Sequence, residues 1–118
     1  MSYEYKATVV RWIDGDTVEL VVDVGFHITY RDHFRLIGID TPERGRPGAA
    51  EAHARAEALA PVGTEVMIAT EKSDKYGRWL ANVYPDAVPI VSNQRTVNGI
   101  LIAEGLAKLY WGGTKDAS

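Results

Sequence analysis

The alternation of apolar and polar residues along the first third of the chain predicts three extended segments. Residues 5–13 and 17–24 are rich in β-branched residues, and the Asp-Gly-Asp sequence at 14–16 between them is typical of a β-hairpin turn. Residues 26–39 continue the extended pattern, with a bend expected near residues 31–32. The first third of the chain is therefore predicted to be entirely β.

Two later segments have a helical pattern, and two more strands lie between them. The alanine-rich segment 46–63 has high helix propensity, and a proline and a glycine end it. Its buried stripe is expected at Ala52, Ala56, Leu59 and Ala60. Residues 64–70 and 78–85 alternate as strands. Residues 96–108 form a shorter helix, which Thr96 or Asn98 would cap and Gly105 would end.

The order of these elements predicts the fold class. Three strands, a helix, two strands and a second helix fit a mainly β protein with α, a five-stranded Greek-key barrel of the oligonucleotide-binding type (OB-fold). Helices and strands do not alternate regularly, which argues against a doubly wound sheet. With 118 residues, the chain is expected to form a single domain over 1–118, with its core at about 5–111.

Composition excludes several classes of site and partner. The chain has no cysteine, so it has neither disulfides nor thiolate-bound zinc, and no apolar run is long enough to span a membrane. The N-terminal residues are too polar for a secretory signal, so we expect a cytoplasmic location. The net charge is −3, which argues against binding nucleic acid by bulk electrostatics. Residues 1–40, with four Lys/Arg and seven Asp/Glu, hold the acid excess, which a divalent cation could offset.

Three short stretches place charged residues beside glycine or proline: "DGDT" at 14–17, "RLIGIDTPE" at 35–43 and "DKYGR" at 74–78. Each alone reads most simply as a turn, a strand end or a polar loop. Together they supply hard oxygen ligands in Asp16 and Asp40, with the Thr41 carbonyl as a further candidate, the ligand type that calcium or magnesium prefers.

The remaining charged residues of these stretches suit phosphate chemistry. Arg35 and Arg78 can each bind a phosphate through a planar bidentate fork. A divalent cation with two guanidiniums would stabilise the extra charge of a pentacovalent phosphorane. Glu43 is then available to position or deprotonate an attacking water.

Histidine and aromatic residues add less. The histidines lack the helical spacing of a zinc motif and are expected to be solvated or packed: His27, His33 and His53. Three aromatic residues within strands are expected to pack in the core: Trp12, Trp79 and Tyr84. Tyr76 and Tyr110 lie outside the strands, where rings can stack on bases or sugars.

Four motifs in order, "DGDT", "RLIGIDTPE", "DKYGR" and "VNGILIAEGLAK", resemble the thermonuclease family typified by staphylococcal nuclease, over roughly residues 5–111. The resemblance implies a five-stranded oligonucleotide-binding barrel and calcium-dependent hydrolysis of the P–O5′ bond of DNA or RNA, with metal-associated water attacking and 3′-phosphate ends remaining. The short loop after Glu43 and the mildly acidic charge depart from the typical enzyme, and the form with "YWGGTK" close to the end looks more like compact bacterial or phage members of that family than secreted ones.

The resemblance also implies a role for individual residues. Asp16 and Asp40 match calcium ligands, Thr41 lends its carbonyl, and Asp14 matches an acid that supports the ligands. Glu43 matches a proposed general base, and Arg35 and Arg78 match two phosphate-binding arginines. Lys75 and Tyr76 match positions that contact a terminal phosphate, and Tyr110 matches a base or sugar contact.

The expected partners are single-stranded or frayed DNA and RNA, with no membrane, and the expected state is a monomer. The alternative is a non-catalytic nucleic-acid-binding OB-fold module. A domain without activity would be expected to have lost a metal-binding acid, the general base or an arginine, and all five are present. A third interpretation, a calcium-binding structural domain, leaves the two arginines unexplained.

Overall fold

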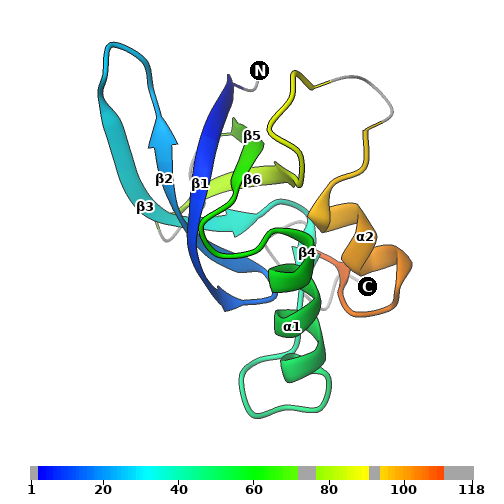
Figure 1. Ribbon diagram of the computed structural model, residues 1–118. Helices are drawn as coiled ribbons and strands as arrows, with labels where there is room; N and C mark the ends of the chain where they lie inside the picture. Colours follow the sequence, from blue (N-terminus) through cyan, green and yellow to red (C-terminus); the bar gives the residue numbers. More distant parts are fainter. Residues whose placement is uncertain (1–2, 72–76, 91–93, 111–118) are drawn as a thin grey trace.

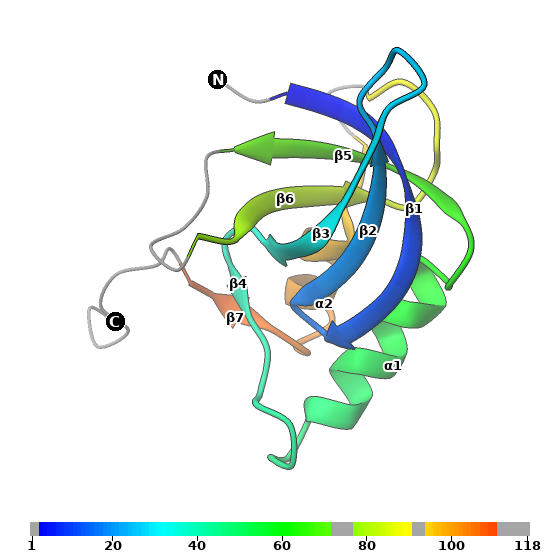
Figure 2. The ribbon, with the colours of Figure 1, turned by 90° about the vertical axis from the view of Figure 1, so that its left-hand side faces the viewer.

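The five longer strands close into a barrel in the order β1-β2-β3-β6-β5 (Figures 1 and 2). They were traced in a computed structural model that describes residues 3–71, 77–90 and 94–110. The barrel strands are β1 (Tyr3–Asp14), β2 (Thr17–Asp23), β3 (Thr29–Leu36), β5 (Glu65–Glu71) and β6 (Trp79–Tyr84). All neighbours pair antiparallel except β3 and β6, which run parallel. The predicted five-stranded barrel of a mainly β protein is confirmed.

The remaining elements gather at one end of the barrel. Helices α1 (Ala49–Leu59) and α2 (Val97–Ala103) contact each other, and Figure 2 shows them below the barrel, at the end that carries the β1–β2 turn. Two short strands, β4 (Ile39–Asp40) and β7 (Lys108–Leu109), pair antiparallel beside them. No described helix is long and apolar enough to cross a membrane.

The alternation of residues in the strands builds the core. In β2, Val18, Leu20 and Val22 point into the barrel and are at most 3% exposed. The stripe predicted for the first helix is confirmed for its three alanines, which are fully buried: Ala52, Ala56 and Ala60. Trp12 is also buried, as predicted, and its indole Nε1 donates a hydrogen bond of 2.8 Å to the carbonyl of Ala60. The barrel and α1 therefore share one core.

The extended segment 26–39 is divided differently from the prediction. β3 runs through the expected bend at residues 31–32 without interruption and stays in register with β2. The strand ends instead before Gly38, whose φ of +77° is a left-handed conformation that favours glycine. This break turns the chain from the barrel into β4, so a single glycine separates the barrel from the segment that carries Asp40.

The structure corrects the prediction for one aromatic residue and decides between the two candidate N-caps of the second helix. Trp79 does not pack in the core as predicted: its exposed fraction is 39%, because it lies at the first position of β6, on the rim of the barrel. Tyr84, at the other end of that strand, is half-buried. At α2 the N-cap is Thr96, whose Oγ1 accepts a 2.9 Å hydrogen bond from the Gly99 N–H.

Candidate active site

The β1–β2 turn delivers Asp16 to the end of the barrel covered by the helices. The carboxylate is buried, with Oδ2 accepting a 3.0 Å hydrogen bond from the Thr41 N–H and Oδ1 accepting one of 3.1 Å from the Thr17 hydroxyl. The backbone carbonyl of Asp16 accepts from the Leu36 N–H at 2.9 Å. Hydrogen bonds from Leu36 and Thr41 therefore hold the turn against the segment that runs from β3 through β4.

Gly15 allows the turn to come this close. A Cβ atom at this position would lie 2.9 Å from the Ala52 Cβ on α1 and 3.0 Å from the Thr41 Cγ2. Contacts that short require something to shift. The absence of a side chain at Gly15 thus sets where Asp16 sits relative to Thr41.

Arg35 joins the two predicted metal-binding acids. Its Nη1 lies 3.1 Å from Asp16 Oδ2, and its Nη2 lies 3.2 Å from Asp40 Oδ1. Arg35 is 9% exposed, and a guanidinium this buried requires paired carboxylates, because an unpaired charge would carry a large desolvation penalty. The structure therefore brings Asp16, Arg35 and Asp40 into one cluster, in which carboxylates outnumber the cation.

Tyr110 lies over this cluster. Its ring centroid is 5.9 Å from the Arg35 Cζ, a cation–π distance, and its backbone N–H donates a 2.8 Å hydrogen bond to the Gly38 carbonyl. The pairing of β7 with β4 places Tyr110 here, since Asp40 lies opposite Lys108. The sequence predicted a base or sugar contact for Tyr110, and the structure adds its contact with the phosphate-binding candidate Arg35.

The cluster offers ligands that suit a hard cation. Asp16 and Asp40 converge on one guanidinium, so their oxygens face a common region. Thr41 contributes a buried Oγ1 that has no hydrogen-bond partner among the described residues. Within that part of the chain, no three residues drawn from His, Cys, Asp and Glu form a group that could hold a metal ion. Two carboxylates with oxygen neighbours fit calcium or magnesium whose shell is completed by water and phosphate.

Arg78 directly precedes β6 and is half-buried. In the parallel pairing of β3 with β6, Arg35 lies opposite Leu80 and Phe34 lies opposite Trp79. Side chains alternate along a strand, so position 78, two before Leu80, falls on the face of the sheet that carries Arg35. Both candidate phosphate ligands thus come to one side of the β3–β6 pair.

Glu43 and Asp14 lie at the margin of the cluster. Glu43 is exposed, two residues beyond Thr41, and its carbonyl accepts a 2.9 Å hydrogen bond from the Arg46 N–H that closes a turn. Asp14 ends β1, and its Oδ1 lies 3.9 Å from an Arg44 Nη2. The structure therefore exposes Glu43 to solvent and pairs Asp14 with Arg44, a cation of the loop that follows β4. Lys75 and Tyr76 lie outside the described residues.

Sequence reasoning missed two polar residues that organise this end of the molecule. Thr17 donates to Asp16, and Asn98, buried in α2, bonds to Val83 on β6 and to the Ile37 carbonyl near β4. An amide within the apolar stripe of a short helix was the available signal for Asn98, which the sequence suggested only as a possible cap.

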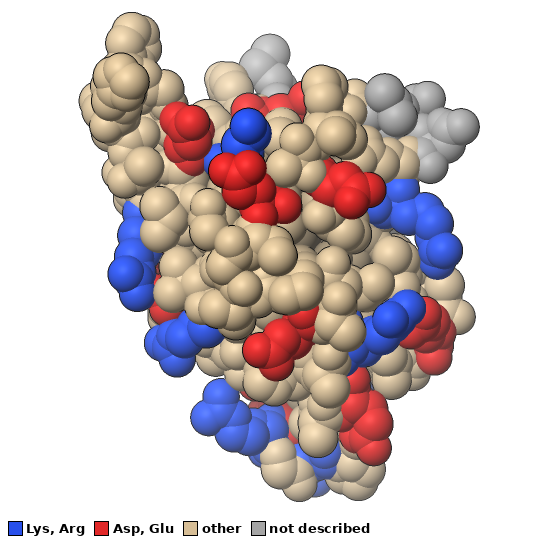
Figure 3. Space-filling view, viewed as in Figure 1, with Lys and Arg blue, Asp and Glu red and all other residues tan. Residues whose placement is uncertain are grey.

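The face of the molecule drawn in Figure 3 carries both signs of charge. On the face drawn in Figure 3, Lys and Arg side chains are interspersed with Asp and Glu rather than gathered into one basic patch. This agrees with the net charge of −3. Binding of an anion would therefore depend on the local arginines more than on the overall field of the molecule.

Comparison with known proteins gives consistent matches. A family profile described as staphylococcal nuclease homologue matches residues 33–117. Micrococcal nuclease of Shigella flexneri is 36% identical over 91% of this chain, Protein ParB of Escherichia coli 32% over 91%, and Endonuclease YncB of Bacillus subtilis 32% over 90%. The matches cover 59%, 58% and 48% of those proteins, respectively, so the chain spans about half the length of the curated relatives it matches.

Proposed function

Because the chain belongs to the staphylococcal nuclease family, we propose that it is a calcium-dependent nuclease that hydrolyses phosphodiester bonds of DNA or RNA. The observation that carries this proposal is the buried Arg35 between Asp16 and Asp40, with Nη–Oδ distances of 3.1 and 3.2 Å. This arrangement would combine a cation ligand set and a phosphate ligand in one place, which a purely structural ion cluster does not need.

Asp16, Asp40 and the Thr41 carbonyl are the proposed calcium ligands, with Asp14 as a supporting acid. Calcium, when bound, would supply positive charge next to the phosphate and lower the cost of the extra negative charge in the transition state. The carboxylates would then divide their oxygens between the cation and Arg35. Asp16 is the more constrained of the two, because Thr17 and Thr41 already donate to it.

The chain's own residues would perform the remaining steps. Arg35 and Arg78 would bind the phosphate oxygens and stabilise the charge that develops there. Glu43 would accept a proton from a water molecule as the water oxygen attacks phosphorus. The P–O5′ bond would break, leaving a 3′-phosphate on one fragment, and O5′ would take a proton from solvent to become a hydroxyl. Lys75, Tyr76 and Tyr110 are the proposed substrate contacts outside this central set.

The second candidate is a non-catalytic OB-fold module that binds single-stranded nucleic acid. It shares the barrel and the arginines, but it has no use for a general base beside the cation ligands. Cleavage therefore separates the two functions. Heat-denatured DNA and RNA should be incubated with purified protein in calcium, in magnesium and in chelator, over neutral to strongly alkaline pH. We expect calcium-stimulated fragments with 3′-phosphate ends, and binding without fragments would favour the module.

Glu43→Gln tests the assigned base within the same assay. The variant keeps the size and polarity of the side chain but cannot accept a proton at neutral pH, so kcat should fall by about 10²-fold or more. Glu57→Gln is the matched control, because Glu57 is an exposed glutamate in the last turn of α1, and it should retain wild-type kcat. Full activity in Glu43→Gln, with the fold checked by circular dichroism, would remove Glu43 from the mechanism.

A further inference from the structure

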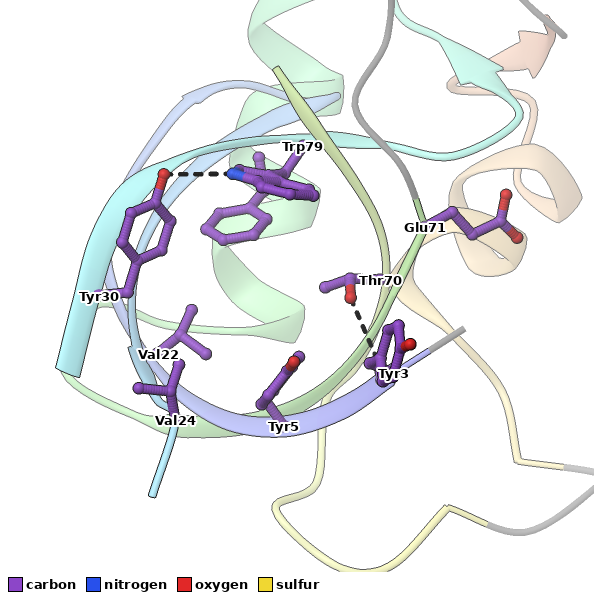
Figure 4. Close-up of a pocket in the computed structure, with 9 residues that line it drawn as sticks. Tyr3, Tyr5, Val22, Val24, Tyr30, Thr70, Glu71 and Trp79 are labelled. Atoms are coloured by element: carbon purple, nitrogen blue, oxygen red, sulfur yellow. Dashed lines mark hydrogen bonds between the residues drawn. The ribbon is translucent and has the colours of Figure 1, made fainter. Parts of the chain in front are cut away.

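The end of the barrel that the helices leave uncovered contains a cavity of about 590 Å³. It opens where β1, β3 and β6 begin and where β2 and β5 end, so its wall is made from all five barrel strands. Figure 4 shows the aromatic rings that dominate this wall. They belong to Tyr3, Tyr5, Tyr30, Phe34 and Trp79. The volume falls in the range of about 300–1,000 Å³ that is usual for ligand pockets.

Three polar side chains of the wall have hydrogen-bond partners within the protein. The Trp79 Nε1 donates to the Tyr30 hydroxyl at 3.1 Å, and that hydroxyl donates to Asp32. Thr70 donates from Oγ1 to the Tyr3 carbonyl at 3.3 Å. Among the lining residues that the structure describes, Glu71 alone is charged, and Figure 4 shows its carboxylate directed away from the rings. The cavity is thus suited to a flat, uncharged group that can stack on aromatic faces.

This cavity adjoins the candidate phosphate ligands through two strands. Phe34 and Trp79, which lie opposite each other in the β3–β6 pairing, face the cavity. The next residue of β3 is Arg35, and the residue before Trp79 is Arg78. Since successive side chains point to opposite faces of a strand, the same two backbones present rings on one side and guanidiniums on the other. A nucleic-acid strand bound at both sites would pass over the start of β6, where Arg78 and Trp79 are adjacent.

We propose that the cavity takes an unstacked nucleobase of the substrate strand, next to the phosphate bound at Arg35 and Arg78. The inference rests on the proposed function and adds a base subsite to it. A base stacks on aromatic rings with little dependence on its identity, and the indole N–H of Trp79 and the hydroxyls of Tyr30 and Thr70 already donate within the protein. The subsite would favour strands whose bases are free to leave the stack. A base held in a duplex cannot enter it.

Binding can be measured while cleavage is slowed, in the full chain with Glu43→Gln and calcium present. The probes are two fluorescein-labelled strands of equal length, oligothymidylate and an abasic strand with the same phosphates. Fluorescence anisotropy gives both Kd values. We expect oligothymidylate to bind about tenfold more tightly, equivalent to about 1.4 kcal/mol, because stacking of one base contributes roughly that much.

Two substitutions at Trp79, added to the same background, assign this difference to the cavity. Trp79→Ala should remove most of the preference for oligothymidylate while leaving the Kd of the abasic strand within about twofold. Trp79→Tyr keeps an aromatic face and should retain the preference even if Trp79→Ala loses stability. Val88→Ala is the control, because Val88 is an exposed apolar residue that does not line the cavity, and it should change neither Kd.

Three results would overturn the base subsite: equal affinity of the parent for both strands, equal weakening of both strands by Trp79→Ala, or no binding of either strand. Failure of the proposed function is a separate result. If the unsubstituted chain cleaves no nucleic acid but the preference for oligothymidylate depends on an aromatic residue at 79, the base subsite stands and the nuclease proposal fails.

Discussion

At the residue scale, Glu19 shows how a charged side chain on the outside of the barrel can influence stability. Its Oε1 lies 2.7 Å from the Arg11 Nε, and its Oε2 lies 2.6 Å from the Arg31 Nε, so one carboxylate bridges the strands on either side of β2. The hydrogen bonds from Arg11 and Arg31 lower the pKa of Glu19 from 4.5 to about 2.

The lowered pKa of Glu19 predicts a pH dependence of stability. In the unfolded chain the carboxyl takes up a proton near pH 4.5, whereas in the folded protein it does so only near pH 2. Its stabilising contribution is therefore complete above about pH 5 and is lost as the pH falls from 4.5 to 2. We expect the difference in free energy of unfolding between wild type and Glu19→Gln, measured by urea denaturation, to shrink over that range.

The exposed Glu57 of α1 supplies a matched comparison for Glu19. Glu57→Gln should leave the pH dependence of unfolding close to that of the wild type. The lowered pKa of Glu19 would be contradicted if the difference in free energy of unfolding between wild type and Glu19→Gln stayed constant from pH 5 to pH 2.

The sequence predicted which residues form the site cluster, but it did not predict the contacts that they make there. Asp16, Arg35 and Asp40 could be grouped from the sequence, because carboxylates and a guanidinium beside turns are unusual among apolar strands. The hydrogen bond from the Thr41 N–H to Asp16 could not be foreseen, since it depends on how closely the β1–β2 turn approaches α1. The sequence suggested only the carbonyl of Thr41, as a metal ligand. In the structure it is the N–H of Thr41 that bonds to Asp16.

At the scale of elements, α2 is joined to the barrel by the side chain of Asn98. Its Oδ1 accepts from the Val83 N–H at 3.1 Å, and its Nδ2 donates to the Ile37 carbonyl at 3.0 Å and to the Ala81 carbonyl at 3.1 Å. Asn98 is 4% exposed, so these backbone groups have little access to water. One amide therefore fixes a helix to β6 and to the residue after β3.

Asn98→Ala should lower the free energy of unfolding by about 2–4 kcal/mol, because it leaves buried backbone groups without partners. Urea denaturation followed by circular dichroism measures the loss. Thr96→Ala, which removes the N-cap of the same helix, should cost only about 1 kcal/mol. Equal losses in the two variants would mean that Asn98 acts as a local helix residue and does not connect elements.

Long periodic segments were predictable at this scale, and short ones were not. The strands of the β1–β2 hairpin and both helices followed from their apolar spacing. The strands β4 and β7 have two residues each, too few for any period, and they form only because they lie side by side. Trp79 was misassigned for a related reason: alternation gives the inward face of a strand, but it does not say where the barrel ends.

At the scale of the whole molecule, calcium should affect stability as well as activity. The cluster of Asp16, Asp40 and Arg35 has more negative than positive charge, and a cation bound only by the folded state stabilises it. Calcium at 100 times its Kd would add about 2.7 kcal/mol. We expect Tm in a thermal scan to rise as calcium chloride replaces potassium chloride at constant ionic strength.

Substitution of one ligand checks where the calcium acts. Asp40→Asn keeps the shape of the side chain but removes its charge, so the calcium-dependent rise in Tm should largely disappear. Glu57→Gln removes a charge far along α1 and should keep the full rise. The same rise in wild type and Asp40→Asn would place calcium outside this cluster.

The pairing of β4 with β7 has a consequence for the order in which the site can be completed during synthesis. Asp40 lies in β4, and its strand partner Lys108 follows 68 positions later in the chain. Translation therefore produces Asp16, Arg35 and Asp40 early, while the strand that holds Asp40 in place, and Tyr110 with it, leaves the ribosome late. A nascent chain with all the acids of the site still lacks β7 and Tyr110, so the proposed activity would be delayed until residue 110 has left the ribosome.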